Sequence, residues 1–202
     1  GDNFYGQSTV HVEAKSNIVA VSAGYRHSLA LSSAGEVIAW GDGRYGKLDV
    51  PDEVQGHVVA ISAGLHHSLA LTASGKVVAW GRDDYGQSSV PEEAESGVIA
   101  IAAGEKHSLA LKSDGSVIAW GISDGSWEDN GQTVVPEAAK SGVIAIAAGG
   151  GPPHPGPGQP VRTGKNAGRR DPASCLLPQR ADPLLRGGSS NGPLYPGQNA
   201  DS

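Results

Sequence analysis

The chain has 202 residues, of which 38% are hydrophobic and 18% charged, with a formal net charge of −6 at pH 7. This acidic balance disfavours nucleic acid as a partner, because phosphate binding uses a basic stripe. The single cysteine, Cys175, excludes an intrachain disulfide framework and a cysteine-rich zinc site.

The chain opens inside a link between repeats, because GDNFYGQSTV matches the stretches that follow Trp40, Trp80 and Trp120. We therefore expect a Val-x-Ala-Trp strand upstream of Gly1. The sequence contains no methionine, so we also expect the natural start and any signal peptide to lie outside it.

A segment beginning at Gly24 recurs at Gly64 and Gly104, a spacing of 40 residues; the second copy reads GLHHSLALTASGKVVAWG. Such a period marks a unit that cannot bury its apolar surface alone and must stack on its neighbours. The repeat cores cover about 18–41, 58–81 and 98–121. We interpret positions identical in every copy as scaffold and variable positions as partner-specific.

Each copy is predicted to form three short antiparallel strands, at 58–63, 67–72 and 76–80 in the second copy. The runs have strand length and are bounded by Gly, Ser or Asp. Three strands per repeat indicate a propeller blade or a rung of a β-solenoid. Small residues in the first strand suit crowding around an axis, and Trp40, Trp80 and Trp120 are expected to be buried between blades. The predicted fold class is therefore all-β, a partial, open β-propeller.

A fourth core, VIAIAAG, begins at Val143 and ends at Gly149, and the composition then changes. Residues 150–202 hold ten of the 13 prolines, with six basic and three acidic residues, against nine basic and 18 acidic residues in 1–149. We predict a propeller domain of about three and a half blades over 1–149 and a disordered tail over 150–202. One hypothesis for the tail is an out-of-frame reading of the gene. The open arc is expected to have apolar end faces, which favour association.

The motifs Ala-Gly-x-x-His-Ser-Leu-Ala-Leu, Gly-x-Val-x-Ala-Trp-Gly and Tyr-Gly-Gln resemble the RCC1-type repeat (regulator of chromosome condensation). The short spacing and the link GQSSVPEEAESGV resemble most closely the beta-lactamase inhibitory protein II group of actinomycetes. The resemblance covers residues 1 to about 149. It implies a seven-bladed propeller with three-stranded blades, and a secreted bacterial inhibitor.

The sequence gives little support for a catalytic site or a metal site. His27, His67 and His107 each precede a serine, but neighbours on a strand point to opposite faces. We interpret these imidazoles as buried and hydrogen-bonded to the neighbouring turn. The acidic loop at 123–131 lacks EF-hand spacing, and GQPVRTGK at 158–165 departs from a phosphate loop. We expect no enzyme activity, no metal site and no cofactor.

Two stretches vary between copies: the turn before the histidine and the turn after Trp-Gly. Both are expected at the same end of the strands, because the first and third strands of an antiparallel three run parallel. Variable loops on a rigid scaffold are where binding specificity is normally placed, although ordinary polar turns also vary. The candidate partner-binding residues are Phe4, Tyr25, Arg26, Asp42, Arg44, Leu65, His66, Arg82, Asp83, Asp84, Glu105, Lys106 and Trp127.

The resemblance also implies which residues grip a target: aromatics just before the histidine, and acids and aromatics after Trp-Gly. Asp2, Asp42 and Phe4 match the second pattern, and Trp127 in the lengthened third link is a candidate anchor. The positions that depart from the pattern are Arg26, His66, Lys106, Arg82 and Ile122.

The predicted function is protein binding by a propeller, with secreted inhibition of a class A beta-lactamase as the first choice. The alternative is a general RCC1 scaffold with another protein partner, including guanine-nucleotide-exchange-type binding. No membrane partner is expected. An open arc carries only part of a loop ring, so inhibition by this chain alone is expected to be weak or absent.

Overall fold

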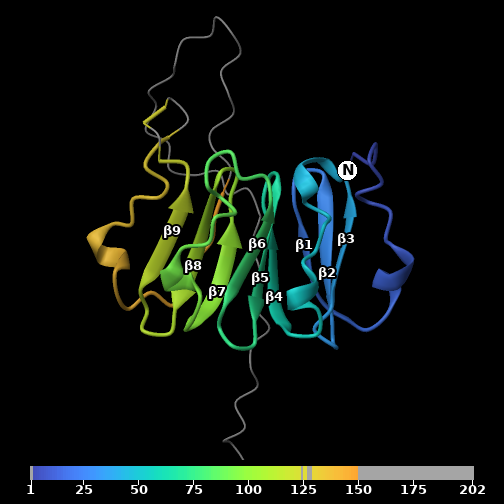
Figure 1. Ribbon diagram of the computed structural model, residues 1–202, viewed down its shortest axis with the longest axis horizontal. Coiled ribbons are helices and arrows are strands. Elements are labelled where there is room, and N and C mark those ends of the chain that lie inside the picture. The colour runs from blue at the N-terminus through green and yellow to red at the C-terminus, as the bar shows by residue number, and fades with distance from the viewer. Residues whose placement is uncertain (1, 124, 127–128, 150–202) are drawn as a thin grey trace, which may run out of the picture.

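The computed structural model describes residues 2–123, 125–126 and 129–149. The predicted tail at 150–202 and the candidate anchor Trp127 lie outside the described residues. Three three-stranded antiparallel sheets follow one another along the chain and stand side by side (Figure 1). The first sheet comprises β1 (Ile18–Ala23), β2 (His27–Ser32) and β3 (Val37–Gly41). The second comprises β4 (Val58–Ala63), β5 (His67–Thr72) and β6 (Val77–Gly81). The third comprises β7 (Val98–Ala103), β8 (His107–Lys112) and β9 (Val117–Gly121).

The predicted all-β fold with three-stranded blades is confirmed. In the second copy the first two strands match the predicted bounds, and the third runs one residue later, over Val77–Gly81. The hairpin between β5 and β6 closes through Thr72, whose amide donates to the carbonyl of Lys76 at 2.9 Å. Gly75 in this turn has φ +82°, which a side-chain-bearing residue rarely adopts.

Short 3₁₀ turns shape the links between the sheets. A proline precedes three of them and fixes the extended entry, as Pro51 does at φ −62°. The turns are η1 (Val12–Lys15), η2 (Arg44–Gly46), η3 (Asp52–Val54), η4 (Glu92–Ala94) and η5 (Glu137–Ala139).

Tryptophans fill the gaps between neighbouring sheets. Trp80 packs in a core with Leu29 and Val37 of the first sheet, and Trp120 packs with Leu69 and Val77 of the second. Trp80 and Trp120 are 6% and 7% exposed, as predicted. Trp40 is only half-buried, so that part of the prediction is wrong. Its indole lies on the outer side of the first sheet, where no further sheet packs within the described residues.

The first strands line up beside one another and are joined by hydrogen bonds between sheets. The amide of Ala63 donates to Ser22 Oγ at 2.9 Å, and the amide of Ala103 donates to Ser62 Oγ at 3.0 Å. Small residues on these strands permit this close approach, which agrees with their expected place near the axis.

The fourth core forms no strand, although the first strand of the other three cores predicts one there. Residues Val143–Gly149 have the same sequence as Val98–Gly104, which contains β7, yet they adopt no strand. The amide of Val143 donates to the carbonyl of Gly115 at 3.0 Å, as that of Val98 donates to Gly75 at 3.1 Å. The segment therefore enters the place of a next first strand, and it lacks the second strand that would complete a ladder in the described part of the chain.

Candidate functional site

The two variable turns meet at one end of every sheet. The amide of Asp42 donates to the carbonyl of Arg26 at 2.8 Å, and Arg82 to His66 at 2.9 Å. Ile122 repeats this contact with Lys106 at 3.0 Å. We call this end the loop face. It comprises residues 2–7, 24–26, 42–47, 64–66, 82–87 and 104–106, and it lies at the arrowhead ends of β3 and β9 (Figure 1).

Tyrosine rings and cations alternate along the loop face. The Arg26 guanidinium lies 5.2 Å from the centre of the Tyr5 ring and 4.8 Å from that of Tyr25. Arg82 lies between two further rings, 5.0 Å from Tyr45 and 5.6 Å from Tyr85.

The row continues without a break across the three sheets. The His66 ring lies 6.1 Å from that of Tyr25 and 5.1 Å from that of Tyr45, which joins the first and second turns. At the far end, Lys106 Nζ lies 4.8 Å from the Tyr85 ring centre. Cation–π contacts of this kind are worth about 0.5–1 kcal/mol each at exposed sites. Together they stabilise the relative positions of the side chains in the row.

Sequence reasoning missed Tyr5, Tyr45 and Tyr85. Each stands before a glycine in a link, and identity between copies was interpreted as a scaffold role. The structure places each ring against the variable residue 21 positions later: Arg26, His66 or Lys106. In each case a tyrosine stands 21 positions before a residue of the variable turn. This fixed spacing was the feature of the sequence that could have identified the three rings.

Several candidate residues are engaged within their own loops. Asp83 accepts from the amide of Ser88 at 2.7 Å and from Ser89 Oγ at 2.6 Å. Asp84 pairs with Arg82 at 2.6 Å. The amide of Leu65 donates to the carbonyl of Gly104 at 3.1 Å, which ties two turns together. These groups position the loops.

Asp42 is also turned inward, because it is only 4% exposed. Its Oδ2 lies 3.1 Å from Lys47 Nζ and 2.8 Å from the Arg44 guanidinium. Hydrogen bonds from Arg44 hold the pKa of Asp42 well below its usual range. Burial lowers the pKa of Lys47, and Asp42 opposes that effect. Asp42 therefore fixes the link from within, contrary to its prediction as a partner contact.

Lys47 replaces the glutamine found at this place in the neighbouring links. In the others, the Gln7 and Gln87 side chains accept from the amides of Tyr5 and Tyr85. The carbonyl of Lys47 nevertheless keeps the common scaffold role and accepts from Trp80 Nε1 at 3.0 Å.

His27 and His67 bond to a serine of the next sheet and not to a neighbouring turn, which corrects the prediction for these two histidines. His27 Nε2 lies 3.0 Å from Ser68 Oγ, and His67 Nε2 lies 2.9 Å from Ser108 Oγ. Ser108 Oγ donates to the carbonyl of Gln87 at 2.9 Å, so the imidazole is the donor to the serine. A serine whose proton is directed at a carbonyl cannot be activated by that imidazole. These pairs are structural.

Acid titration should expose this structural role. Burial lowers the pKa of His27 to about 4 and that of His67 to about 3, from 6.5. Below pH 6.5 the unfolded chain binds protons that the folded imidazoles do not, so stability is full above pH 6.5 and falls as the pH drops toward 4. We expect a loss of about 1.4 kcal/mol per pH unit for each imidazole, measured by urea unfolding from pH 7.5 to 4.5.

Two substitutions make that measurement specific. His67→Gln keeps an N–H for Ser108 and removes one titrating group, so its slope should be clearly shallower. His11→Gln, at an exposed position, controls for the effect of a histidine-to-glutamine change on stability itself. An unaltered slope in His67→Gln would show that burial of this imidazole does not set the acid sensitivity.

Within the described residues, no group of three or more His, Cys, Asp or Glu side chains is arranged to hold a metal ion. No helix in this part of the chain is both long and apolar enough to cross a membrane.

The repeats match a known family model. The regulator of chromosome condensation (RCC1) repeat matches residues 18–47, 58–87 and 98–132, which span the three sheets and the links that follow them. No curated protein matches the chain significantly.

Solved propeller structures are similar over most of the repeats. Yeast RCC1 (Prp20) bound to Kap60 is 29% identical, with 67% of this chain and 40% of that chain covered and a TM-score of 0.49. Prp20p from Saccharomyces cerevisiae, studied with its binding to Gsp1p and histones, is 32% identical, with coverages of 63% and 37% and a TM-score of 0.46.

Human WBSCR16 is 22% identical, with coverages of 71% and 46% and a TM-score of 0.52. The chain spans less than half the length of each of these proteins. The likeness to WBSCR16 concerns the fold and agrees with the strand pattern described above. The three stretches that match the RCC1 repeat model thus fold as consecutive three-stranded blades of a β-propeller.

Proposed function

We propose that this chain is a non-enzymatic propeller that binds another protein through its loop face. The observation that carries the proposal is the continuous row of tyrosine rings and cations across three sheets. The loop face also presents large apolar surfaces to solvent: Phe4 is 83% exposed, Tyr25 57% and Tyr45 51%. Aromatic and arginine side chains of this kind dominate the binding energy of protein interfaces.

The row is also held in place before any partner arrives. The Tyr25 ring is held by Arg26 and His66, and the turn beneath it is tied to the next link by the bond between Arg26 and Asp42. Side chains ordered in advance lose less entropy on association, so more of the contact energy is available for affinity.

The finer proposal is a secreted inhibitor that binds a class A beta-lactamase. It is supported by the motifs and the short repeat spacing, and by Phe4, which matches an aromatic position of the inhibitor pattern. Asp42 gives it no support, because its carboxylate is buried and paired. The alternative is a scaffold for another protein, including guanine-nucleotide-exchange-type binding, and it is supported by the basic side chains of Arg26 and Lys106.

A binding titration against a panel of class A beta-lactamases, with small GTPases as the comparison set, distinguishes these two partners. For whichever protein binds at micromolar concentration, Tyr25→Ala should weaken the affinity by at least about tenfold, because an exposed anchor ring is removed. Ile99→Ala is the control, since this exposed side chain lies on a strand away from the loops. If Tyr25→Ala and Ile99→Ala bound a confirmed partner with equal affinity, the loop face would not be the binding surface.

A further inference from the structure

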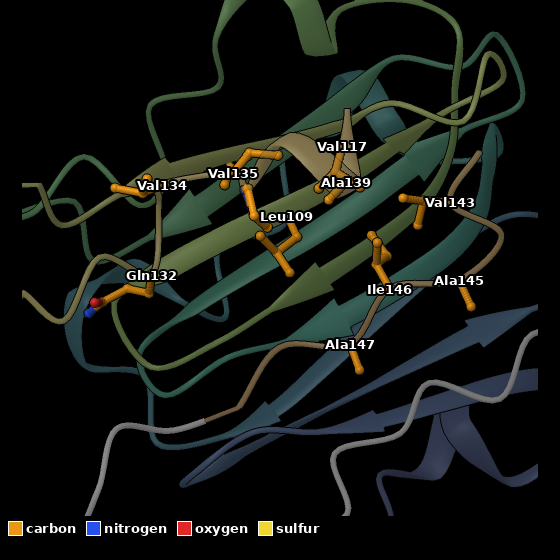
Figure 2. A pocket seen from close by; sticks show the side chains of 12 residues that line it. Leu109, Val117, Gln132, Val134, Val135, Ala139, Val143, Ala145, Ile146 and Ala147 are labelled. Carbon is orange, nitrogen blue, oxygen red and sulfur yellow. The ribbon is translucent and has the colours of Figure 1, made fainter. Parts of the chain in front are cut away.

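The groove beside the third sheet belongs to the scaffold. It has a volume of about 330 Å³ and is lined almost entirely by aliphatic side chains, including Leu109 and Val117 (Figure 2). Their counterparts Leu69 and Val77 pack with Trp120 in the core between the second and third sheets. The groove therefore repeats the packing surface that neighbouring sheets share.

The loop face contains a departure from the repeat that packing between sheets does not explain. In the third link, Gln87 accepts from the amide of Tyr85 at 2.9 Å, and Asp83 accepts from the amide of Ser88 at 2.7 Å. Ser88 Oγ donates to the carbonyl of Arg82 at 2.9 Å. The first link repeats all three bonds at the equivalent positions. These two links therefore share one conformation, fixed by their side chains.

Three residues remove these bonds from the second link. Lys47 stands at the position of the glutamine, and its ammonium cannot accept a hydrogen bond. Gly43 and Leu48 stand at the positions of the aspartate and the serine, and neither has a polar side chain. The amide of Tyr45 accordingly donates to no residue in the described part of the chain.

A different network shapes the second link. The Asp42 carboxylate lies 3.1 Å from Lys47 Nζ and accepts from the amide and the guanidinium of Arg44. The link forms the 3₁₀ turn η2, in which Tyr45 has φ +65°. A residue with a side chain seldom adopts this left-handed conformation. The tyrosines of the other two links do not adopt it.

This conformation places the Tyr45 ring at the surface. Tyr45 is 51% exposed, whereas Tyr5 and Tyr85 are half-buried. The second link lies between two described sheets, so neither end of the row of sheets accounts for this exposure. The ring is also held in place, because its centre lies 5.1 Å from that of the His66 ring and 5.0 Å from the Arg82 guanidinium carbon.

We propose that Lys47 is a positioning residue that makes Tyr45 the anchor of the loop face. Together with Gly43 and Leu48, it removes the bonds that the other links share, and it holds Asp42 inward while the tyrosine ring faces outward. An exposed ring whose position is fixed in advance has the properties of a binding hot spot. The anchoring role rests on the proposed function of the loop face, whereas the conformation of the link is testable without a partner.

Amide hydrogen exchange of the 202-residue protein, followed by nuclear magnetic resonance, tests the conformation. The Tyr85 amide is bonded to Gln87, whereas the Tyr45 amide has no acceptor among the described residues. The protection factor of the Tyr85 amide should therefore be at least about tenfold higher. Equal protection of the two amides would overturn the proposal.

A restored variant with Gly43→Asn, Lys47→Gln and Leu48→Ser carries the side chains of the first link. Its Tyr45 amide should gain protection to the level of the other link tyrosines. Lys140→Gln is the matched control, on a side chain that is 61% exposed, and it should leave the Tyr45 amide unprotected.

A folded restored variant in which the Tyr45 amide stays unprotected would refute the positioning role. Circular dichroism and urea unfolding show whether the variant is folded. If the triple change prevents folding, Lys47→Gln alone decides, because it supplies the acceptor for the Tyr45 amide and should produce the same gain in protection.

The anchoring role is measured with a protein that binds in the panel of class A beta-lactamases and small GTPases. The restored variant and Tyr45→Ala should each bind it at least about tenfold more weakly than the parent. Combining the changes should cost no more than Tyr45→Ala alone, because both displace the same ring. Additive losses would contradict the positioning role. If no protein in the panel binds, the anchoring role fails with the proposed function, and hydrogen exchange still decides the conformation of the link.

Discussion

Gly64→Ala should unfold or severely destabilise the protein, with a loss of about 3 kcal/mol or more in the free energy of unfolding. A methyl group at this position would lie 2.5 Å from the carbonyl oxygen of Gly104 and 2.6 Å from Cε1 of His67. The first contact is with the backbone of the next sheet, and the second is with an imidazole that is fully buried. Neither group can yield without separating two sheets.

Urea unfolding monitored by tryptophan fluorescence measures this effect. Gly43→Ala provides the control, because its methyl group would meet only Leu48 at 3.5 Å and its φ of −83° suits alanine. Its stability should stay within about 0.5 kcal/mol of the parent, as expected for a surface change. Comparable losses in both variants would mean that the approach of Gly64 to Gly104 is not tight in solution.

Trp80→Ala should cost about 3–5 kcal/mol, because it leaves a cavity between the first and second sheets. The substitution also leaves the carbonyl of Lys47 without its indole donor. Trp40→Ala removes the same side chain and the same hydrogen bond to a link carbonyl, that of Gln7. Its cost should be markedly smaller, since Trp40 is half-buried.

Thermal unfolding of the two variants at low protein concentration gives this comparison directly. The low concentration keeps any association from adding stability to one variant. If Trp40→Ala were as damaging as Trp80→Ala, the Trp40 indole would be fully packed in solution, and the first sheet would have a neighbour under those conditions.

The repeat made the fold predictable, because identical spacing of apolar runs and turn residues left few architectures open. The strand bounds followed from the same pattern to within one residue. Burial of Trp40 and the strand at Val143–Gly149 were wrong for a shared reason: a repeat shows what a unit does between two neighbours. Within the described residues, the outermost units lack the partner that buries an indole or completes a ladder.

The loop face was only partly predictable. Topology alone placed the two variable turns at one end, because strand direction in an antiparallel three is fixed. Side-chain partners inside the turns were not predictable, since they depend on contacts between links 20 or 40 residues apart. Asp42 was predicted as a partner contact and Tyr45 was not. The structure places the Tyr45 ring against His66 on the loop face, whereas Arg44 and Lys47 hold the Asp42 carboxylate inward.

The bonds from His27 to Ser68 and from His67 to Ser108 join only adjacent sheets. Folding energetics in such a row are those of a one-dimensional lattice, in which each unit is stabilised by itself and by the coupling to its nearest neighbours. The second sheet is coupled on both sides and the outer two on one side within the described residues. Local unfolding therefore starts at the outer sheets of the described row and proceeds toward the second sheet. The cooperativity of unfolding depends on the strength of the hydrogen bond between each histidine and the serine of the next sheet.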